Sequence, residues 1–579
     1  MPSLYENISG VELFVQDGNL YSRPVRAPGD TVLIIGPAID GPNDKALDLM
    51  NMADVEAVYG PIVFSNDYRG PNAQNSGFSG NHLIKSLREA QAGGARNIKL
   101  MRVGGVTASG SFNMPANLNV GASGTILVYA RYAGRLYNST NVSVSFTSGA
   151  TGGSVTVTQP AVKGGNFTIS WSGATSGLTV LDVIDRVNSD VRNRTVYLVA
   201  GTIAKTAAAR ILHGGATLAN GTDGTEWDDL GSSAGKKRLY DKLTETDIGT
   251  FALLDDEIMD IVVLAGLYAD DAVDGNGGGT TPTLSVITAF DQFLARRSLD
   301  HSMIGVIGTR PLSNNFNDYT KIVEHYNALV NTTAGVRETG WLNAGYFMNA
   351  GFNYTNNNLE QSIDAGAYLS VVAVDGLWLD PNLGSYIESC AAAYAGLISS
   401  LPPQESTTLK TVKGPSALAY KFKRAYVDTL TGGIGRDKNA GVYGGAAYVT
   451  ALLEPGVGYL YNQDVTAANR RSDFKNLQTV RIVQAVQNNV KSIVFPYLGR
   501  PNNEPIRQSL LTDVKNYLDS LYSQGALLGK EGAGYFVEMD ARGNSPFERT
   551  LGILSLDITL VPAFQIKKIR INVKVTHGS

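Results

Sequence analysis

The sequence has few of the residues from which covalent bridges and metal sites are built. Its 579 residues include one cysteine, Cys390, and five histidines. One cysteine cannot form an internal disulfide, and the scattered histidines do not give the ligand spacing of a zinc site. Scaffolds held together by disulfides or zinc are therefore excluded.

The sequence also lacks a strong charge of one sign and a long apolar run. The 48 Lys and Arg residues nearly balance 52 Asp and Glu residues, so no overall basic field favours nucleic acid or anionic lipid. The longest apolar stretches, 261–269 and 390–398, fall far short of the roughly 20 residues of a membrane helix. Residues 1–9 show no basic start and apolar run, so secretion by the general route is not expected. We expect no direct nucleic-acid partner and no membrane insertion.

Apolar residues and glycine are plentiful instead. Hydrophobic residues make up 43% of the chain and charged residues 17%, which excludes disorder as the main state. The 64 glycines and 27 tyrosines favour many turns and broad sheet surfaces. A chain of 579 residues is long enough for several domains.

Apolar patterns in most of the chain predict an α/β or α+β protein with mixed sheets flanked by helices. Continuous apolar runs are typical of buried strands, and apolar residues three or four apart are typical of amphipathic helices. Strands are expected at 31–35, 98–103, 260–265, 303–307, 368–374, 535–539, 552–560 and 566–575. Helices are expected at 53–59, 82–91, 234–243, 386–399, 477–490 and 505–524.

Residues 106–214 differ in composition from both neighbouring segments. They are rich in Ser, Thr, Gly and Val, and short strand-like runs alternate with Gly or Asn, which predicts an inserted all-β domain, a sandwich or a barrel. The expected division is an N-terminal arm (1–28), an α/β core (29–105 and 215–465), the insert (106–214), a C-terminal domain (466–561) and a C-terminal arm (562–579).

No motif predicts catalysis or cofactor binding. The segment Gly432–Gly435 lacks the last glycine of a dinucleotide fingerprint, and no phosphate-binding loop motif occurs. The acidic loop 270–276 misses the alternate-ligand spacing of a calcium loop, which favours a solvated turn. We expect an inert buried thiol at Cys390 and a capping or surface role for His82, at a helix start. The sequence thus predicts no catalytic, cofactor-binding or metal-binding residue, and no enzyme.

The two chain ends carry the most informative pattern. Val11, Leu13, Val15 and Leu20 alternate with polar residues around an Asp-Gly turn, and Ile569, Ile571, Val573 and Val575 alternate with polar residues, some of them basic. Both patterns are typical of strands, and a terminal strand needs a sheet to pair with. On pattern alone that sheet could belong to the same molecule or to another one.

Charge is distributed unevenly along the chain. Residues 471–579 contain 14 Lys and Arg against 9 Asp and Glu, whereas the remainder contains 34 against 43. The C-terminal part could therefore meet an acidic surface, although chance asymmetry of solvated side chains explains the numbers equally well.

A series of segments along the chain forms a recognisable order. They are TVLIIGPAIDGPNDK (31–45), MADVEAVYGP (52–61), HLIKSLREAQAGGARNIKLMRV (82–103), LANGTDG (218–224), YDKLTETDIGTFALLDDEIMDIVVLAG (240–266), LLTDVKNYLDSLYSQGALLG (510–529), YFVEMD (535–540) and GILSLDITLVPAFQIKKIRINVKV (552–575). In this order the segments resemble contractile-tail sheath proteins, which wrap the tube of contractile phages and related injection machines. The resemblance covers residues 28–105 and 215–579 and leaves the insert as a family-variable decoration.

The resemblance implies a structural function for the chain ends. Sheath subunits exchange N- and C-terminal arms with their neighbours, so the resemblance implies intermolecular strands at the arm positions named above. It implies a helical homopolymer around a tail tube protein, with baseplate and tail terminator proteins as further partners, assembled in the host cytoplasm and located in the virion tail. It also implies a C-terminal domain that faces the tube, with Arg507, Lys515 and Lys530 as contact candidates.

One function from another class stays open on the sequence. The Ser/Thr/Gly-rich strands of 106–214 also fit a secreted or surface protein that binds carbohydrate or mediates adhesion. That alternative predicts specific glycan binding by the insert, whereas the sheath interpretation predicts an insert that can be removed without stopping assembly.

Overall fold

The computed structural model describes most of the chain between residues 30 and 565. The described residues are 30–38, 40–48, 51–60, 81–103, 116–119, 124–132, 137, 140–146, 152–159, 164–172, 178–209, 212–218, 240–245, 249–254, 257–269, 272–273, 284–298, 301–311, 320, 322–323, 326, 351–356, 359–364, 366–380, 384–431, 448–468, 472–539 and 554–565.

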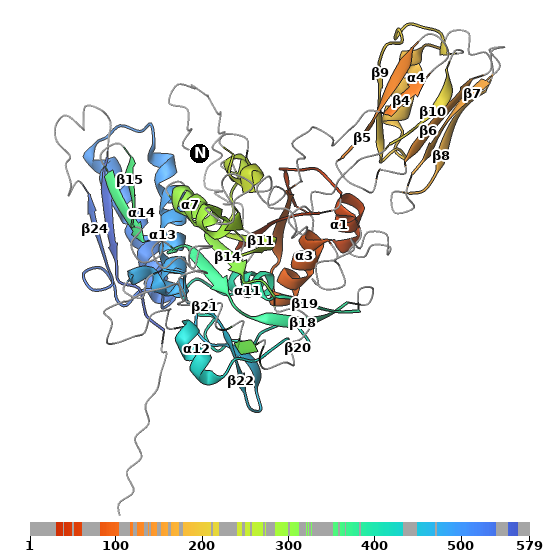
Figure 1. The fold of residues 1–579 in the computed structure, drawn as a ribbon. Coiled ribbons are helices and arrows are strands. Elements are labelled where there is room, and N and C mark those ends of the chain that lie inside the picture. The colour runs from red at the N-terminus through yellow and green to blue at the C-terminus, as the bar shows by residue number, and fades with distance from the viewer. Residues whose placement is uncertain are drawn as a thin grey trace, which may run out of the picture.

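A seven-stranded sheet forms the centre of the molecule (Figure 1). Its order is β2-β3-β1-β11-β14-β17-β21, and every neighbouring pair is parallel except β2 with β3. The strands are β1 (Thr31–Gly36), β2 (Ala46–Asp48), β3 (Asn97–Arg102), β11 (Ile261–Tyr268), β14 (Ile304–Gly308), β17 (Leu369–Val372) and β21 (Tyr448–Val449). Strand β11 is buried along its whole length, as a parallel strand covered on both faces must be.

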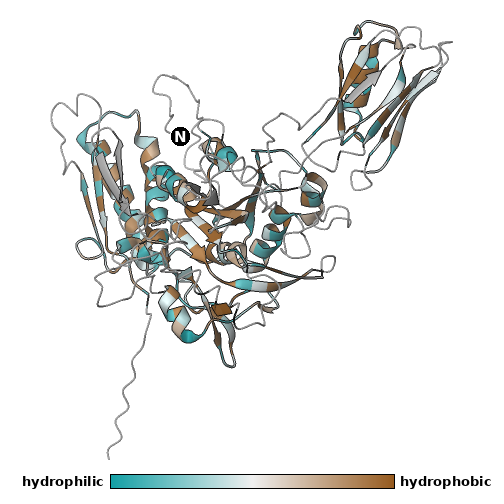
Figure 2. Cartoon of the chain, viewed as in Figure 1, coloured by the Kyte–Doolittle hydropathy of each residue, from teal (hydrophilic) through white to brown (hydrophobic). Residues whose placement is uncertain are grey.

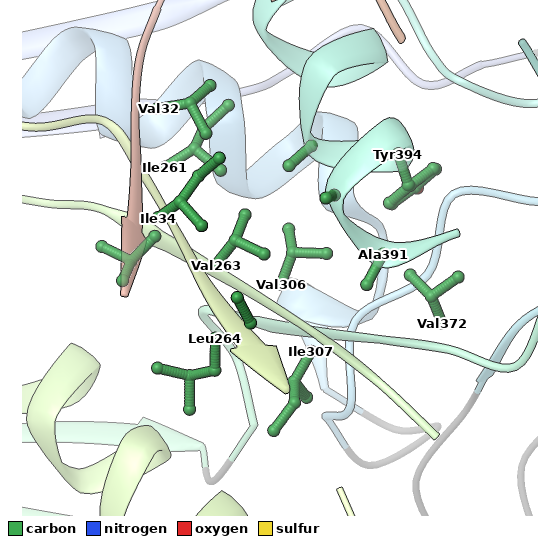
Figure 3. Packing of buried hydrophobic residues seen from close by; sticks show 14 of the residues in the cluster. Val32, Ile34, Ile261, Val263, Leu264, Val306, Ile307, Val372, Ala391 and Tyr394 are labelled. Carbon is green, nitrogen blue, oxygen red and sulfur yellow. The ribbon is translucent and has the colours of Figure 1, made fainter. Parts of the chain in front are cut away.

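Helices cover both faces of this sheet. Gly305 and Gly308 of β14 are three residues apart and so face opposite sides; a Cβ at Gly305 would meet Phe290 and one at Gly308 would meet Ala391. Helix α7 (Val286–Arg297) therefore lies on one face and α11 (Ala391–Ser400) on the other. Figure 3 shows strand side chains such as Val263 and Val306 packed near Ala391 and Tyr394.

Helix α3 (His82–Gly93) packs against α11 at very short range. A Cβ at Gly93 would lie 2.1 Å from the carbonyl oxygen of Ala393, and one at Gly396 would lie 2.1 Å from that of Ala90. Glycine is required at both positions because the two backbones touch. The described residues of this region also form the helices α1 (Met52–Tyr59), α6 (Thr250–Leu253) and α12 (Arg424–Thr431).

Small antiparallel sheets flank the centre. They comprise β12 (Ala272–Val273) with β13 (Leu284–Ser285), β15 (Gly351–Asn356) with β16 (Leu359–Asp364), β18 (Asp375–Asp380) with β19 (Gly384–Ser389) and β20 (Ala417–Leu418), and β22 (Ala451–Glu454) with β23 (Gly458–Tyr461). The helix expected from 386 begins only at Ala391, because Tyr386 and Ile387 pair with Trp378 and Leu377 as part of β19. The start of that prediction was wrong.

The insert has a hydrophobic cluster of its own and projects from the centre (Figure 1). Its described residues form two antiparallel sheets and no barrel: β4 (Ala116–Asn119), β5 (Thr125–Ala130) and β9 (Val196–Ala200) form one, and β10 (His213–Thr217), β6 (Asn141–Phe146), β7 (Gly152–Thr158) and β8 (Phe167–Ser172) form the other. Helix α4 (Val180–Ser189), which the strand pattern did not predict, begins at a capping box of Thr179 and Asp182.

The described part of the C-terminal region comprises two helices and a two-stranded sheet. The elements are α13 (Leu477–Val494), α14 (Glu504–Ser523), β24 (Tyr535–Met539) and β25 (Leu556–Leu560), with short 3₁₀ turns η8 (Asp473–Lys475) and η9 (Phe495–Tyr497). Asn503 caps α14 by accepting from the Ile506 amide at 3.1 Å, and Leu510, Val514 and Leu518 form its buried stripe.

The mixed α/β architecture predicted from the sequence is confirmed. Figure 2 shows that apolar residues concentrate in the central strands, while the helices that cover them carry polar residues on other faces. No helix among the described residues combines the length and the apolar character needed to cross a membrane.

Candidate functional site

The predicted arm strands lie outside the described residues. This holds for Val11, Leu13, Val15 and Leu20 and for Ile569, Ile571, Val573 and Val575. The first described residue after the N-terminal segment is Asp30, and the last before the C-terminal segment is Gln565. These two residues, which we call the arm roots, are the first and the last that the structure describes, and both are held by specific hydrogen bonds.

Asp30 is held by the end of α11 and by α13. Its amide donates to the carbonyl oxygen of Ser399 at 3.2 Å, and its Oδ2 accepts from Arg481 Nη2 at 3.3 Å. Arg481 lies on α13 with only 3% of its side chain exposed. The root of the N-terminal segment is therefore fixed to a buried guanidinium.

Arg481 also donates hydrogen bonds to backbone carbonyl groups in the last turn of α11 and in the segment after it. Its Nη2 donates to Ile398 O at 2.9 Å and Leu401 O at 2.6 Å, and its Nη1 donates to Pro402 O at 3.2 Å and Glu405 O at 3.4 Å. Helix ends leave such carbonyls without intrahelical partners, and a cation there is favourable. Burial lowers the pKa of Arg481 and the Asp30 carboxylate opposes this, but a guanidinium stays protonated in proteins.

Gln565 is held on the same stretch of chain. Its Oε1 accepts from Ser406 Oγ and from Thr408 Oγ1, the latter at 2.8 Å, and its Nε2 donates to Asp464 Oδ1. Asp464 is 1% exposed, so this carboxylate depends on its donors. The Thr408 amide donates to Ser406 Oγ at 3.0 Å, which orders the hydroxyl that faces Gln565.

Gln478 links the segment that holds Asp30 to the chain beside Gln565. Its side-chain Nε2 donates to Gln404 O at 2.6 Å and to Ala563 O at 3.3 Å, while its backbone amide donates to Asp464 Oδ2 at 3.2 Å. Gln478 lies three residues before Arg481, so both side chains leave the same face of α13. We call the connected set the terminal junction: Asp30, segment 398–408, Asp464, Gln478, Arg481 and Ala563–Gln565.

The terminal junction was not predicted from the sequence. Gln478, Arg481, Gln484 and Asn488 recur at spacings of three and four, which on a helix normally indicates a solvated face. Here Gln484 is 6% exposed and donates to the carbonyls of Asp260 and Ser302, both at 2.9 Å. The only available signal was that this polar stripe lacks Lys and Glu, which a solvated helix face usually contains.

The β24–β25 sheet is a second candidate surface. Tyr535 and Val537 are buried, and Tyr535 donates to Asp519 Oδ1 of α14 at 2.9 Å, so this face of β24 packs inward. Phe536 is 44% exposed on the opposite face. Among the described residues no further strand pairs with β25, or with β24 beyond Tyr535. Open strand edges of this kind accept an added strand.

The outer face of this sheet is acidic. Glu538 of β24 lies directly opposite Asp557 of β25 in the antiparallel register, and alternation places both side chains on the Phe536 face. Like charges directly opposite each other are unfavourable in a sheet. A basic strand laid on or beside this pair would remove the repulsion.

The three tube-contact candidates lie on or near α14. Arg507 is half-buried in the first turns of α14, and Lys530 is exposed in the following loop. Lys515 Nζ lies 2.6 Å from Glu531 Oε1, so its charge is already compensated. Because Glu531 follows Lys530 in the sequence and contacts Lys515, Lys515 and Lys530 lie near each other. Arg507 lies eight residues before Lys515 on α14, about 12 Å away along the helix axis.

A buried cluster of titratable groups lies between α3 and β19. Glu388 Oε1 accepts from Tyr268 Oη at 2.6 Å and from the Ser389 amide at 3.1 Å, and Glu388 Oε2 lies 3.9 Å from His82 Nδ1. His82 is 2% exposed, so the predicted surface or capping role was wrong: β11, where a Cβ at Gly266 would meet the His82 ring, and β19, which carries Glu388, cover the start of α3. Burial, with the nearby Glu388 charge, raises the pKa of Glu89.

The described residues contain no exposed nucleophilic thiol and no cluster of metal ligands. Cys390 is fully buried, as predicted, and burial raises the pKa of its thiol, which disfavours the nucleophilic thiolate. Over the same residues, no three His, Cys, Asp or Glu side chains come together as metal ligands would.

Comparisons with known proteins identify the C-terminal region directly. Residues 470–576 match the model of the phage tail sheath C-terminal domain family. This range contains α13, α14 and the β24–β25 sheet. No curated protein sequence matches the chain.

Solved structures match over nearly the whole chain. A sheath tail protein from Listeria innocua aligns with a TM-score of 0.50 and 13% identity over 93% of this chain and 96% of its own. A sheath tail protein from Desulfitobacterium hafniense gives 0.49 and 15% over 91% and 93%. A chain of the contracted anti-feeding prophage baseplate gives 0.49 and 11% over 99% and 98%. The resemblance found in the sequence is confirmed: the chain has the fold of a sheath tail protein, and its residues 470–576 match the phage tail sheath C-terminal domain family.

Proposed function

We propose that this protein is the structural subunit of a contractile tail sheath. Subunits polymerise around a tail tube and contract from a metastable extended state, which drives the tube through a host envelope. The observation that carries the proposal is the match of residues 470–576 to the sheath C-terminal domain, in which the β24–β25 sheet pairs with no further strand among the described residues and is followed in the sequence by a segment of alternating apolar pattern.

Neighbouring subunits would be joined by strand addition to the β24–β25 sheet. The C-terminal segment offers Lys567, Lys568, Arg570 and Lys574, and the sheet offers the opposed carboxylates of Glu538 and Asp557. Main-chain hydrogen bonds provide the affinity in this mode of binding, and the side chains fix the register. The charge match favours this segment of a neighbour as one added strand, with the segment around Val11–Leu20 as the other.

Contraction would use no nucleotide. The compact lattice buries more complementary surface than the extended one, and a difference on the order of a few kcal/mol per subunit, summed over the polymer, does the work. The C-terminal domain (466–561) would face the tube and the insert (106–214) would lie outside. Weak, screened contacts through Arg507 and Lys530 would let the tube slide, because exposed ion pairs are worth little.

The proposal includes the partners and the place of assembly. They are further copies of this chain, a tail tube protein, and baseplate and terminator proteins, assembled in the host cytoplasm into the virion tail. Direct nucleic-acid binding and membrane insertion have no part in it.

Truncation tests the arms. Pro562 pairs with Leu527, and the Ala563 amide donates to Ala526 O at 2.9 Å, so residues up to Gln565 belong to the folded body. Deleting 566–579, or 1–28, should leave folded monomers that form no tubes in negative-stain electron microscopy. Tubes from either truncation would contradict the arm assignment.

A point substitution gives a matched control. Ile571→Pro removes one main-chain donor and should abolish tubes, whereas Ile571→Val keeps the strand and should assemble as the parent does. Equal assembly by both variants would mean that this segment pairs with no sheet.

A further inference from the structure

We propose that the terminal junction fixes the two arms of one subunit to each other, with Arg481 and Gln565 as positioning residues. Tension on one arm would then reach the other through a few side chains rather than through the domain cores. The inference rests on the proposed function, because it assumes that both ends bind neighbouring subunits.

Both arm roots, Asp30 and Gln565, are attached to one stretch of chain. Asp30 donates to Ser399 O, and Gln565 accepts from Ser406 and Thr408. Residues 398–408 thus hold both ends of the described chain. A separation of more than five hundred positions in sequence is closed by one short segment.

Helix α13 makes this attachment rigid. Arg481 binds Asp30 and four backbone carbonyls, and Gln478, one turn earlier, binds Gln404 O and Ala563 O. Both side chains are nearly buried, at 3% and 7% exposure. Buried, fully partnered polar groups allow few alternative arrangements, since every loosened bond leaves a desolvated donor or acceptor.

A polymer of arm-linked subunits requires a firm connection between the two arms of each subunit. Each subunit is one link, and its two arms must stay connected while other contacts are exchanged during contraction. Roots held only by loops would open at low free-energy cost, as loosely packed segments do. Roots that share a buried junction open together, at the cost of the whole network.

The pairing at Gln565 allows a rescue experiment. Gln565→Glu places a carboxylate against Asp464 and should break the contact. Adding Asp464→Asn restores a donor and acceptor pair in reversed polarity: the new amide donates, and the new carboxylate still accepts from Ser406 and Thr408. A purely structural defect would not be repaired by a second substitution of this kind.

Amide hydrogen exchange on the full-length monomer measures the coupling directly. Gln565→Glu should speed exchange at Ala563 about tenfold or more, the effect of one unsatisfied buried group, and should also speed exchange at Asp30. The double variant should restore both. Faster exchange at Ala563 with no change at Asp30, or no change at either, would overturn the proposal.

Two further variants keep the test decisive. If Gln565→Glu does not fold, Ser406→Ala removes one donor at lower cost, and the same two amides are compared. Arg481→Lys keeps the charge but lacks the forked donors, so it should loosen Asp30 first and Ala563 as well. Unchanged exchange at both amides in these variants would also contradict the coupling.

Electron microscopy of triggered sheaths separates the two levels of the account. Parent and double-variant tubes should contract intact, and Gln565→Glu tubes should break. If the single variant contracts intact, the coupling is wrong while the sheath function stands. If the parent forms no tubes, the proposed function fails, and the exchange experiment still decides whether the roots are joined.

Discussion

The insert and the C-terminal region are attached to the centre in different ways. The insert packs in its own hydrophobic cluster, and a buried hydrogen bond reaches the centre, where Tyr137 Oη donates to Asp40 Oδ1. Helix α13, by contrast, contributes Leu477 and Val480 to the central cluster and Ile482 to the C-terminal cluster. The insert is an attachment to the centre, whereas the C-terminal region continues it.

This difference suits a sheath subunit. A domain with a separate core can vary in sequence or be lost without disturbing the rest, and its attachment at one end of the molecule leaves the centre intact (Figure 1). A region that shares a helix with the centre moves with it as one body. The arms would then act on a single rigid unit, with the insert carried along.

The largest contrast is expected between two deletions. Ending the chain after 471 removes Leu477 and Val480 from the central cluster and should give insoluble or molten protein. Replacing 106–214 with a short linker should leave a folded centre that still assembles. Soluble expression and near-ultraviolet circular dichroism distinguish the two. Cooperative folding of the truncated chain would show that the centre does not need α13.

A matched pair of core substitutions should separate the two regions next. Ile482 and Ile184 are buried helix residues, at 1% and 4% exposure. Each Ile→Ala change should cost about 3 kcal/mol of local unfolding free energy. In calorimetry, Ile184→Ala should shift only an insert transition, and Ile482→Ala the transition shared by the centre and the C-terminal region. A single transition that moves in both variants would remove the distinction.

A smaller effect is expected at the contact that holds the insert. Tyr137 is 1% exposed, and its pKa is raised by burial and by Asp40. Tyr137→Phe removes the hydrogen bond and should cost about 1 kcal/mol. Small-angle scattering should then show a wider range of insert orientations. Tyr197→Phe, at a site 49% exposed, is the control and should change nothing.

The smallest expected effect is a pH dependence confined to the insert. A hydrogen bond from Arg192 lowers the pKa of Asp190 from its ordinary 3.8 to about 2. A depressed carboxyl pKa stabilises the fold above the unfolded value and loses that contribution as pH falls through the folded value. The insert should weaken between about pH 4 and pH 2, and Asp190→Asn should reduce that slope, leaving the part due to Asp182, whose pKa is also lowered by its hydrogen bonds with Thr179. An unchanged slope in the variant would rule out Asp190 as its source.

The sequence was most informative where one pattern had one explanation. Helix α14 was predicted within one residue, because Pro505 marks its first turn and a regular apolar stripe leads to Gly525. The central strands were also predicted, since short apolar runs such as 31–35 are typical of buried parallel strands. The order of the sheath-like segments then carried the resemblance to sheath proteins, whose fold the chain has.

Features that depend on distant residues could not be predicted. The polar residues of α13 fit a solvated face until Ile398–Glu405, Asp260 and Ser302 are placed against them. Helix α4 was missed although Thr179, Asp182 and the spacing of Val180, Val183 and Ile184 indicate it, because the surrounding Ser/Thr-rich runs favoured strands throughout. The strand propensity of the surrounding residues thus led to a wrong prediction for 180–189.

The most direct test is the structure of an assembled tube by cryo-electron microscopy, traced from one subunit to the next. The account predicts that residues 566–579 of one subunit pair as a strand with the β24–β25 sheet of another, near its Glu538 and Asp557. Tubes in which both chain ends fold back onto their own subunit, with neighbours touching only through compact surfaces, would contradict it.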